Sequence, residues 1–326
     1  MKWHKTYLGH KFEIREGDVV LKAFTVQFDG IIVQGDPGHG LLPEPVPEKN
    51  IEWAMRNEWS RCNRVKRTFT ELGFSRGRLP NDVWGSISAY NYNNKANAAR
   101  EEWDSKGYFV NWWDVTPYLL GMPWNLKRVW QNRLKDMVEA WIGGIPLENT
   151  DIYGIRRYED GARLLTHVDR EATHAASMII NVEQVDMRED WMVEIYDFAG
   201  RLHEIPMKPG DIVYYESARC LHGRMKPLRG KSYSNLFTHY RPAGDPEWYL
   251  KENPPGTPEQ LHEIGSCTAH SEAMGDIGMD CDKAGSLPFL SQSGSTVSGP
   301  DDLFKYWKKV SPSPEEVAAV HAKYGR

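Results

Sequence analysis

Three side chains with metal-binding chemistry stand near the middle of the chain: His167, Asp169 and His222. One residue separates the first two, and His222 follows Asp169 by 53 positions. Two imidazoles and one carboxylate suit a borderline divalent metal. On one face of an octahedron they leave three positions open, as in mononuclear non-haem Fe(II) centres. The three residues are therefore a candidate metal site.

Neighbouring motifs support this site, because a His-x-Asp pair alone is expected by chance in a chain with 11 histidines. Tyr158 stands nine positions before His167, and Lys231 stands nine positions after His222, within Gly-Lys-Ser-Tyr-Ser-Asn. The segment from Tyr158 to Arg241, about a quarter of the chain, resembles the prolyl 4-hydroxylase-like branch of the Fe(II)/2-oxoglutarate-dependent oxygenases.

The resemblance implies a role for each of these residues. The three metal-site candidates would hold Fe(II), with 2-oxoglutarate and O2 as cosubstrates at the open positions. Lys231 would bind the distal carboxylate of 2-oxoglutarate as a compact cation, and Tyr158 and Ser234 are further candidates for binding this cosubstrate. The implied reaction couples decarboxylation of 2-oxoglutarate to succinate with activation of a substrate C–H bond. Because Asp169 stands where halogenating members carry a small residue, we do not expect halogenation.

The sequence constrains the substrate less than the cofactors. The loop from Glu183 to Trp191 replaces the Gly-Gly-rich segment usual in prolyl hydroxylases. This difference favours an amino-acid-like small molecule that carries a carboxylate, and its C–H bond would be hydroxylated or would close a ring. A peptidyl-prolyl 4-hydroxylase is the alternative. The candidate substrate-binding residues are Arg156, Arg157, Arg163, Arg224 and Trp191.

Two other protein classes fit part of the pattern. A non-catalytic jelly-roll binding module of cupin or lectin type would need neither Lys231 nor iron. A zinc hydrolase also needs three protein ligands, but the chain contains no His-Glu-x-x-His motif, and this class gives no reason for Lys231. Oxygen-dependent release of succinate would distinguish an oxygenase from both.

Whole-chain composition narrows the class of partner. A formal net charge of −5 and a pI near 6.1 do not favour nucleic acid or an anionic membrane. No apolar run reaches the length of a membrane span, and the N-terminus lacks the apolar core of a secretion signal. The four scattered cysteines form neither a disulfide framework nor a zinc motif. We expect a soluble protein of the cytoplasm or another reducing compartment with a small-molecule partner; its oligomeric state is not predicted.

Short β-rich segments separated by turn signals must bring the metal-site candidates together. They predict an antiparallel double-stranded β-helix, or jelly roll, within a mainly β (α+β) fold buttressed by helices. In this fold the His-x-Asp pair and the distal histidine come from facing strands at the mouth of the barrel. Strands are expected at 18–33 (with a break near Asp29-Gly30), 151–158, 178–182, 191–196, 212–215 and 234–240.

Helices are expected on either side of these strands. Residues 123–142 carry apolar side chains at helical spacing and end at Gly143-Gly144. A helix is also expected at 50–62, and Ser313-Pro-Glu-Glu316 is a capping box that opens a terminal helix. Residues 80–118 show no clean period and predict strand and loop.

The domain organisation follows from these elements. We expect a single oxygenase domain over residues 1–250, with N-terminal strands and supporting helices in 1–150 and the metal-binding core in 151–242. A C-terminal extension occupies 251–326. Within it, residues 253–301 are rich in Gly, Ser, Pro and Asp, which favours extended or partly disordered wrapping.

Overall fold

The computed structural model describes residues 48–101, 115–260 and 295–323 with their side chains, and gives five further segments as strands without side-chain detail. Those segments are β1 (Trp3–Glu16), β2 (Val19–Val33), β15 (Cys267–Ser271), β16 (Ile277–Cys281) and the start of β17 (Ser291–Thr296). Residues 34–47 and parts of 253–301 lie outside the described residues.

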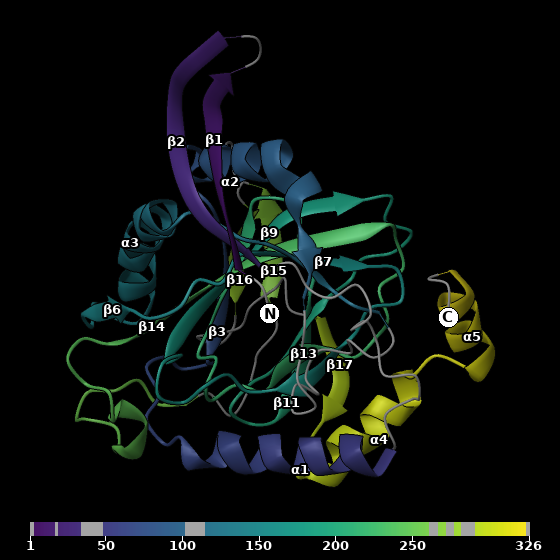
Figure 1. Ribbon diagram of the computed structural model, residues 1–326. Coiled ribbons are helices and arrows are strands. Elements are labelled where there is room, and N and C mark those ends of the chain that lie inside the picture. The colour runs from purple at the N-terminus through teal and green to yellow at the C-terminus, as the bar shows by residue number, and fades with distance from the viewer. Residues whose placement is uncertain are drawn as a thin grey trace.

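Two antiparallel sheets form the centre of the molecule (Figure 1). The larger sheet has the order β3-β12-β9-β14-β7-β5-β4, with β6 beside β14, and the smaller sheet has the order β17-β11-β10-β13-β8. The bounds are β3 Phe74–Arg78, β4 Ala99–Arg100, β5 Tyr118–Leu120, β6 Leu147–Asn149, β7 Ile155–Glu159, β8 Leu164–His167, β9 Ala176–Val185, β10 Val193–Tyr196, β11 Arg201–Ile205, β12 Asp211–Tyr215, β13 His222–Arg224 and β14 Ser232–Pro242.

The strand order identifies the architecture. From β7 to β14 the chain moves between the sheets so that β7 pairs with β14, β8 with β13, β9 with β12, and β10 with β11. Buried side chains of both sheets, Ile179 and Val213 from one and Val193 and Ile195 from the other, share one cluster. This is the predicted double-stranded β-helix, and nested pairing brings residues far apart in sequence into contact.

Helices α2 (Asn81–Asn94) and α3 (Trp124–Trp141) pack against the larger sheet and share a core with it. The prediction of α3 is confirmed. The prediction of strand and loop across 80–118 is wrong for α2, which buries Val83, Ile87, Tyr90, Asn91 and Asn94 at helical spacing. Two of these are asparagines, so the sequence shows no clear helical repeat of apolar residues. Packing against α3 stabilises the helix although the helix propensity of its residues is low.

Helices α1 (Glu48–Arg64) and α4 (Pro300–Val310) lie side by side beneath the smaller sheet (Figure 1). Ile51 and Met55 of α1 and Leu303 and Tyr306 of α4 share a buried cluster with strands β8, β10 and β11. Within 253–301, the predicted irregular wrapping is therefore wrong where β17 joins the edge of the sheet beside β11 and where α4 begins.

The two ends of the chain add a hairpin and a helix. Strands β1 and β2 pair over their length, and Asp29 and Gly30 lie within the ladder opposite Tyr7 and Thr6, so the predicted break is absent from β2. Figure 1 shows this hairpin projecting past α2. The capping box of α5 (Pro314–Lys323) is confirmed, because the Ser313 N–H donates to Glu316 at 2.8 Å and the Glu316 N–H to Ser313 Oγ at 3.2 Å.

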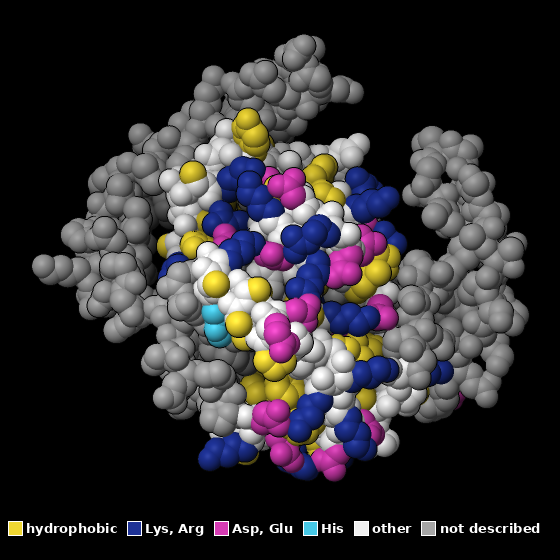
Figure 2. Space-filling model, turned by 90° about the vertical axis from the view of Figure 1, so that its right-hand side faces the viewer, with side chains coloured by type: hydrophobic (Ala, Val, Ile, Leu, Met, Phe, Trp, Pro, Cys, Tyr) yellow, Lys and Arg dark blue, Asp and Glu magenta, His cyan; other side chains and the backbone are white. Residues whose placement is uncertain are grey.

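The described surface carries both signs of charge. Figure 2 shows basic and acidic side chains interspersed over one face of the molecule, and ion pairs such as Arg188–Asp160 and Arg229–Glu316 follow the same pattern. A single-sign patch of the kind that binds a nucleic-acid backbone is not seen on this face. Every helix among the described residues is too short or too polar to cross a membrane.

A buried carboxyl next to the core predicts a pH dependence of stability. Burial raises the pKa of Glu216 to about 7, although Thr70 and Phe69 donate hydrogen bonds to it. Because the folded pKa exceeds the unfolded value, this contribution is fully present below about pH 4.5 and is lost as the pH rises through 7. We expect the free energy of unfolding, relative to Glu216→Gln, to fall by up to about 3 kcal/mol over that range. Urea unfolding of both proteins at several pH values measures it, and parallel pH profiles would contradict the prediction.

Candidate metal centre and its cavity

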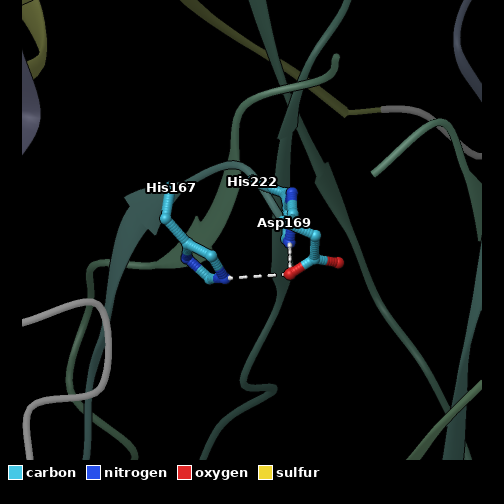
Figure 3. A group of neighbouring side chains, drawn as sticks. All are labelled: His167, Asp169 and His222. Atoms are coloured by element: carbon cyan, nitrogen blue, oxygen red, sulfur yellow. Dashed lines mark ion pairs between the residues drawn. The ribbon is translucent and has the colours of Figure 1, made fainter. Parts of the chain in front are cut away.

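His167, Asp169 and His222 converge at one end of the smaller sheet. His167 ends β8, His222 begins β13, and the two are paired across these neighbouring strands. Asp169 follows β8 and turns back, so that its Oδ1 lies 3.8 Å from His167 Nε2 and 3.9 Å from His222 Nε2 (Figure 3). One ligand atom from each residue lies within 4.8 Å of the others. A single ion can therefore reach all three.

Backbone carbonyls fix the tautomer of both histidines. His167 Nδ1 lies 2.7 Å from the carbonyl oxygen of Leu165, and His222 Nδ1 lies 2.9 Å from that of Cys220. Since a carbonyl can only accept, each Nδ1 carries the proton, and each Nε2 keeps its lone pair on the side of Asp169. Backbone carbonyls that accept from Nδ1 in this way orient metal-binding histidines in proteins.

Burial and charge set the protonation state of the three groups. Burial and, next to it, the neighbouring His222 lower the pKa of His167 to about 3, although Asp169 opposes the shift. Burial by itself would raise the pKa of Asp169, but the surrounding histidines, His222 first, hold it well below its usual value. The site thus favours neutral imidazole and ionised carboxylate, the forms that bind a metal.

The loop that carries Asp169 is held from outside the sheet by helix α1. Arg61 donates to the carbonyls of Val168 at 3.1 Å and Asp169 at 2.6 Å, and Glu58 accepts the Val168 N–H at 3.0 Å. Arg61 and Glu58 also pair with each other at 2.8 Å. A helix more than 100 residues upstream therefore positions the carboxylate between the two histidines.

Tyr215 holds the other oxygen of this carboxylate. Its hydroxyl donates to Asp169 Oδ2 at 3.2 Å, and its ring lies edge-on to His222 at 4.7 Å. We expect Tyr215→Phe to weaken Fe(II) binding by about 10-fold, because Asp169 loses the donor that orients it. Anaerobic competition with a chromophoric chelator measures the Kd. Tyr214→Phe is the matched control, since Tyr214 stacks on Trp141 from the opposite face of β12; equal effects of the two substitutions would contradict this role.

A cavity of about 60 Å³ opens beside the three residues and lies between the two sheets. Its other lining side chains come from both sheets and from the segment before β7: Tyr153, Arg156, Leu164, Ile179, Val193, Tyr215, Arg224, Asn235, Phe237 and His239. The volume suffices for an ion and about two waters, so a larger ligand must displace lining side chains.

Lys231, the cation expected from the sequence, does not line this cavity. It precedes β14, and its side chain is exposed, which corrects its assignment as a buried anchor. Ser234 is buried but does not line the cavity either. Side chains alternate along a strand, and Asn235, Phe237 and His239 occupy the cavity face of β14.

Arg224 supplies the buried cation instead. It stands two residues after His222 on β13, is 3% exposed and lines the cavity. Its guanidinium lies between the rings of Trp191 and Tyr233 at 4.4 and 4.5 Å and donates to the Trp191 carbonyl and the Tyr233 hydroxyl. Among the described residues, no carboxylate pairs with Arg224. A buried cation without a counter-ion is costly, so the site is built to receive an anion.

The remaining candidates support Arg224 or lie elsewhere. Trp191 does not line the cavity; its ring packs on Arg224 and edge-on to Tyr158 at 5.1 Å. Tyr158 is fully buried, and burial raises the pKa of its hydroxyl while Arg156 opposes the shift. Arg156 lines the cavity but forms a two-pronged pair with Glu101, both contacts at 2.6 Å.

Two arginines serve other contacts. Arg163 donates to the Met225 carbonyl at 2.6 Å and to Ser311 Oγ at 3.1 Å, at the end of α4. Arg157 pairs with Glu159 at 3.4 Å and lies over the Tyr118 ring at 4.5 Å. Neither lines the cavity.

Sequence reasoning missed part of the cavity wall, most clearly Tyr153, Tyr215 and His239. In the structure, His239 faces the cavity from β14. The available signal was the alternation along β14, because Asn235, Phe237 and His239 share one face of it.

No protein-family model matches the chain, and none of the curated proteins matches its sequence. Solved structures of similar fold include a prolyl-4-hydroxylase from Pseudomonas putida, with 14% identity over 60% of this chain and 100% of the other and a TM-score of 0.40. An oxidoreductase of the 2OG-Fe(II) oxygenase family from Burkholderia pseudomallei has 11% identity over 65% and 98%, with a TM-score of 0.38. HygX from Streptomyces hygroscopicus, solved with nickel and 2-oxoglutarate bound, has 12% identity over 54% and 85%, with a TM-score of 0.38.

Proposed function

We propose that this protein is an Fe(II)- and 2-oxoglutarate-dependent oxygenase that activates a C–H bond of a small molecule. One observation carries the proposal: a ligand set of two imidazoles and one carboxylate shares a cavity with a buried cation, Arg224, that no carboxylate of the described ranges neutralises. A zinc hydrolase requires only the metal ligands, and a sugar-binding module requires neither the ligands nor the cation. A keto acid that binds the metal and carries a second carboxylate requires both.

In this proposal His167, Asp169 and His222 hold Fe(II). The ion supplies the site where O2 and the keto acid react, and this chemistry belongs to the cofactor. In a hydroxylation, one oxygen atom of O2 enters succinate as 2-oxoglutarate loses CO2, and the other enters the substrate C–H bond. In a ring closure, the substrate loses two hydrogen atoms and the second oxygen leaves as water.

Arg224 takes the role that the sequence assigned to Lys231. It binds the distal carboxylate of 2-oxoglutarate through a planar guanidinium, which suits two-pronged contact with a carboxylate. The Trp191 and Tyr233 rings hold the guanidinium in place. The pocket thus excludes water around the ion pair, which strengthens it.

For the substrate, we favour an amino-acid-like small molecule over a peptidyl proline. The cavity between the two sheets measures about 60 Å³, whereas an extended peptide binds in a groove at the surface. A carboxylate on the substrate would have to compete with Glu101 for Arg156, since Arg224 is taken by the cosubstrate. Peptidyl-prolyl hydroxylation is the alternative that a substrate panel must test.

We further propose that residues 1–250 form the oxygenase domain with its core at 151–242, and that β17 and α4 of the C-terminal extension cover the smaller sheet. Cys62 and Cys220 are buried free thiols, which supports a reducing compartment such as the cytoplasm.

The test is anaerobic addition of Fe(II) and 2-oxoglutarate to the purified protein. We expect a weak visible charge-transfer band and, after admission of O2, release of succinate stimulated by a small-molecule substrate. The panel contains free amino acids, N-alkylated amino acids and proline-rich peptides. Absence of both the band and succinate in the wild-type protein would refute the proposed function.

A further inference from the structure

A chain of hydrogen bonds behind the cavity determines which ring nitrogen of His239 carries a proton. The Ser217 hydroxyl lies 3.0 Å from the carbonyl oxygen of His174, which can only accept, so Ser217 donates there. With its one proton used, Ser217 must accept from Ser177 at 2.6 Å. Ser177 in turn must accept from His239 Nδ1 at 2.8 Å. His239 therefore donates from Nδ1 and keeps a lone pair on Nε2.

The Nε2 atom of His239 has no partner in the part of the chain that the structure describes. It makes no hydrogen bond to any residue that the structure describes and is not fully enclosed, while the His239 ring lines the cavity beside the metal-site carboxylate. The ring of His174 stacks on the His239 ring with centroids 3.7 Å apart and holds it in place. The ring of Tyr153, a partly exposed residue, lies 5.9 Å from His239. An acceptor that is held in a fixed orientation next to the metal site is available to a hydrogen-bond donor of the substrate.

We propose that His239 determines specificity by accepting a hydrogen bond through Nε2 from a neutral O–H or N–H group of the substrate. This inference rests on the proposed oxygenase function and narrows its substrate class. The Nδ1 atom of His239 is 3.8 Å from Asp169 Oδ2, and Nε2 belongs to the same five-membered ring, so a donor bound at Nε2 would lie close to the metal site. A neutral donor fits better than a cation, since the guanidinium of Arg156 lines the same cavity.

Two substitutions separate this role from a structural one. His239→Asn places an amide nitrogen where Nδ1 stood, so it keeps the bond to Ser177 and removes the acceptor. His239→Gln reaches the position of Nε2 with an amide oxygen, so it keeps an acceptor and loses the bond to Ser177. The wild type and both variants are tested for 2-oxoglutarate turnover with alcohols and secondary amides, each beside its O- or N-methylated counterpart.

We expect the wild type to prefer the donor-bearing member of a pair by about 10- to 100-fold in kcat/KM. His239→Gln should keep this preference and His239→Asn should lose it. Equal turnover of capped and uncapped compounds by the wild type overturns the proposal. It is also overturned if no donor-bearing compound stimulates turnover, if Asn outperforms Gln, or if both variants lose the preference equally. The Fe(II)–2-oxoglutarate band is recorded in parallel. If the wild type shows no band, the proposed oxygenase function is rejected. If the band is present and the panel is negative, only the proposal for His239 is rejected.

Discussion

His167→Ala is expected to abolish the Fe(II)–2-oxoglutarate band and to lower 2-oxoglutarate turnover by well over 100-fold. Loss of a partner that merely orients a ligand costs 10- to 100-fold in metal affinity or activity, and this substitution removes a ligand itself. The remaining pair, Asp169 and His222, offers two donor atoms to a centre that needs three. Anaerobic titration with Fe(II) followed by visible spectroscopy and a succinate assay measures both effects.

The matched control is His203→Ala. His203 is also fully buried, but its Nε2 pairs with Asp197 at 2.9 Å and it does not line the cavity. This variant should lose stability and still bind Fe(II) and 2-oxoglutarate when folded. If His167→Ala bound both ligands as tightly as the wild type does, the three-residue metal site would be rejected.

Arg224→Met is expected to raise the Kd for 2-oxoglutarate by about 100-fold or more, because removal of one partner of a buried, hydrogen-bonded charge pair costs 2–5 kcal/mol. Without the ligand, the same substitution relieves a buried cation of its desolvation cost. We therefore expect the free energy of unfolding of the ligand-free protein to fall by no more than about 1 kcal/mol. Anaerobic calorimetry and urea unfolding measure the two quantities.

Lys231→Met serves as the control for Arg224→Met, since it removes an exposed cation from the same region of the chain. It should leave the Kd for 2-oxoglutarate unchanged. The opposite outcome, a large loss of affinity in Lys231→Met and none in Arg224→Met, would return the anchoring role to Lys231. Loss in neither variant would leave no cation to neutralise the distal carboxylate and would count against 2-oxoglutarate as the ligand.

Residue types and motifs in the sequence predicted the metal-binding residues and the class of fold. His167, Asp169 and His222 were identifiable from residue type and from the motifs around them. Neighbouring strands of both sheets were visible because β-branched and aromatic residues cluster between turns, but β8 and β13, which carry His167 and His222, were not predicted. Helix α3 was equally clear, since its apolar face repeats at helical spacing over several turns. These are local properties of the chain.

That Arg224 and His239 face the cavity was visible only in the tertiary structure. Lys231 and Arg224 are both basic residues near His222 in sequence, yet Arg224 shares the inward face of β13 with His222, while Lys231 lies before β14 in solvent. Helix α2 forms against α3 despite its asparagines. The orientation of His239 depends on Ser177 and Ser217, 62 and 22 residues away along the chain. Such outcomes depend on strand register and cross-sheet packing, which a local pattern of residues does not encode.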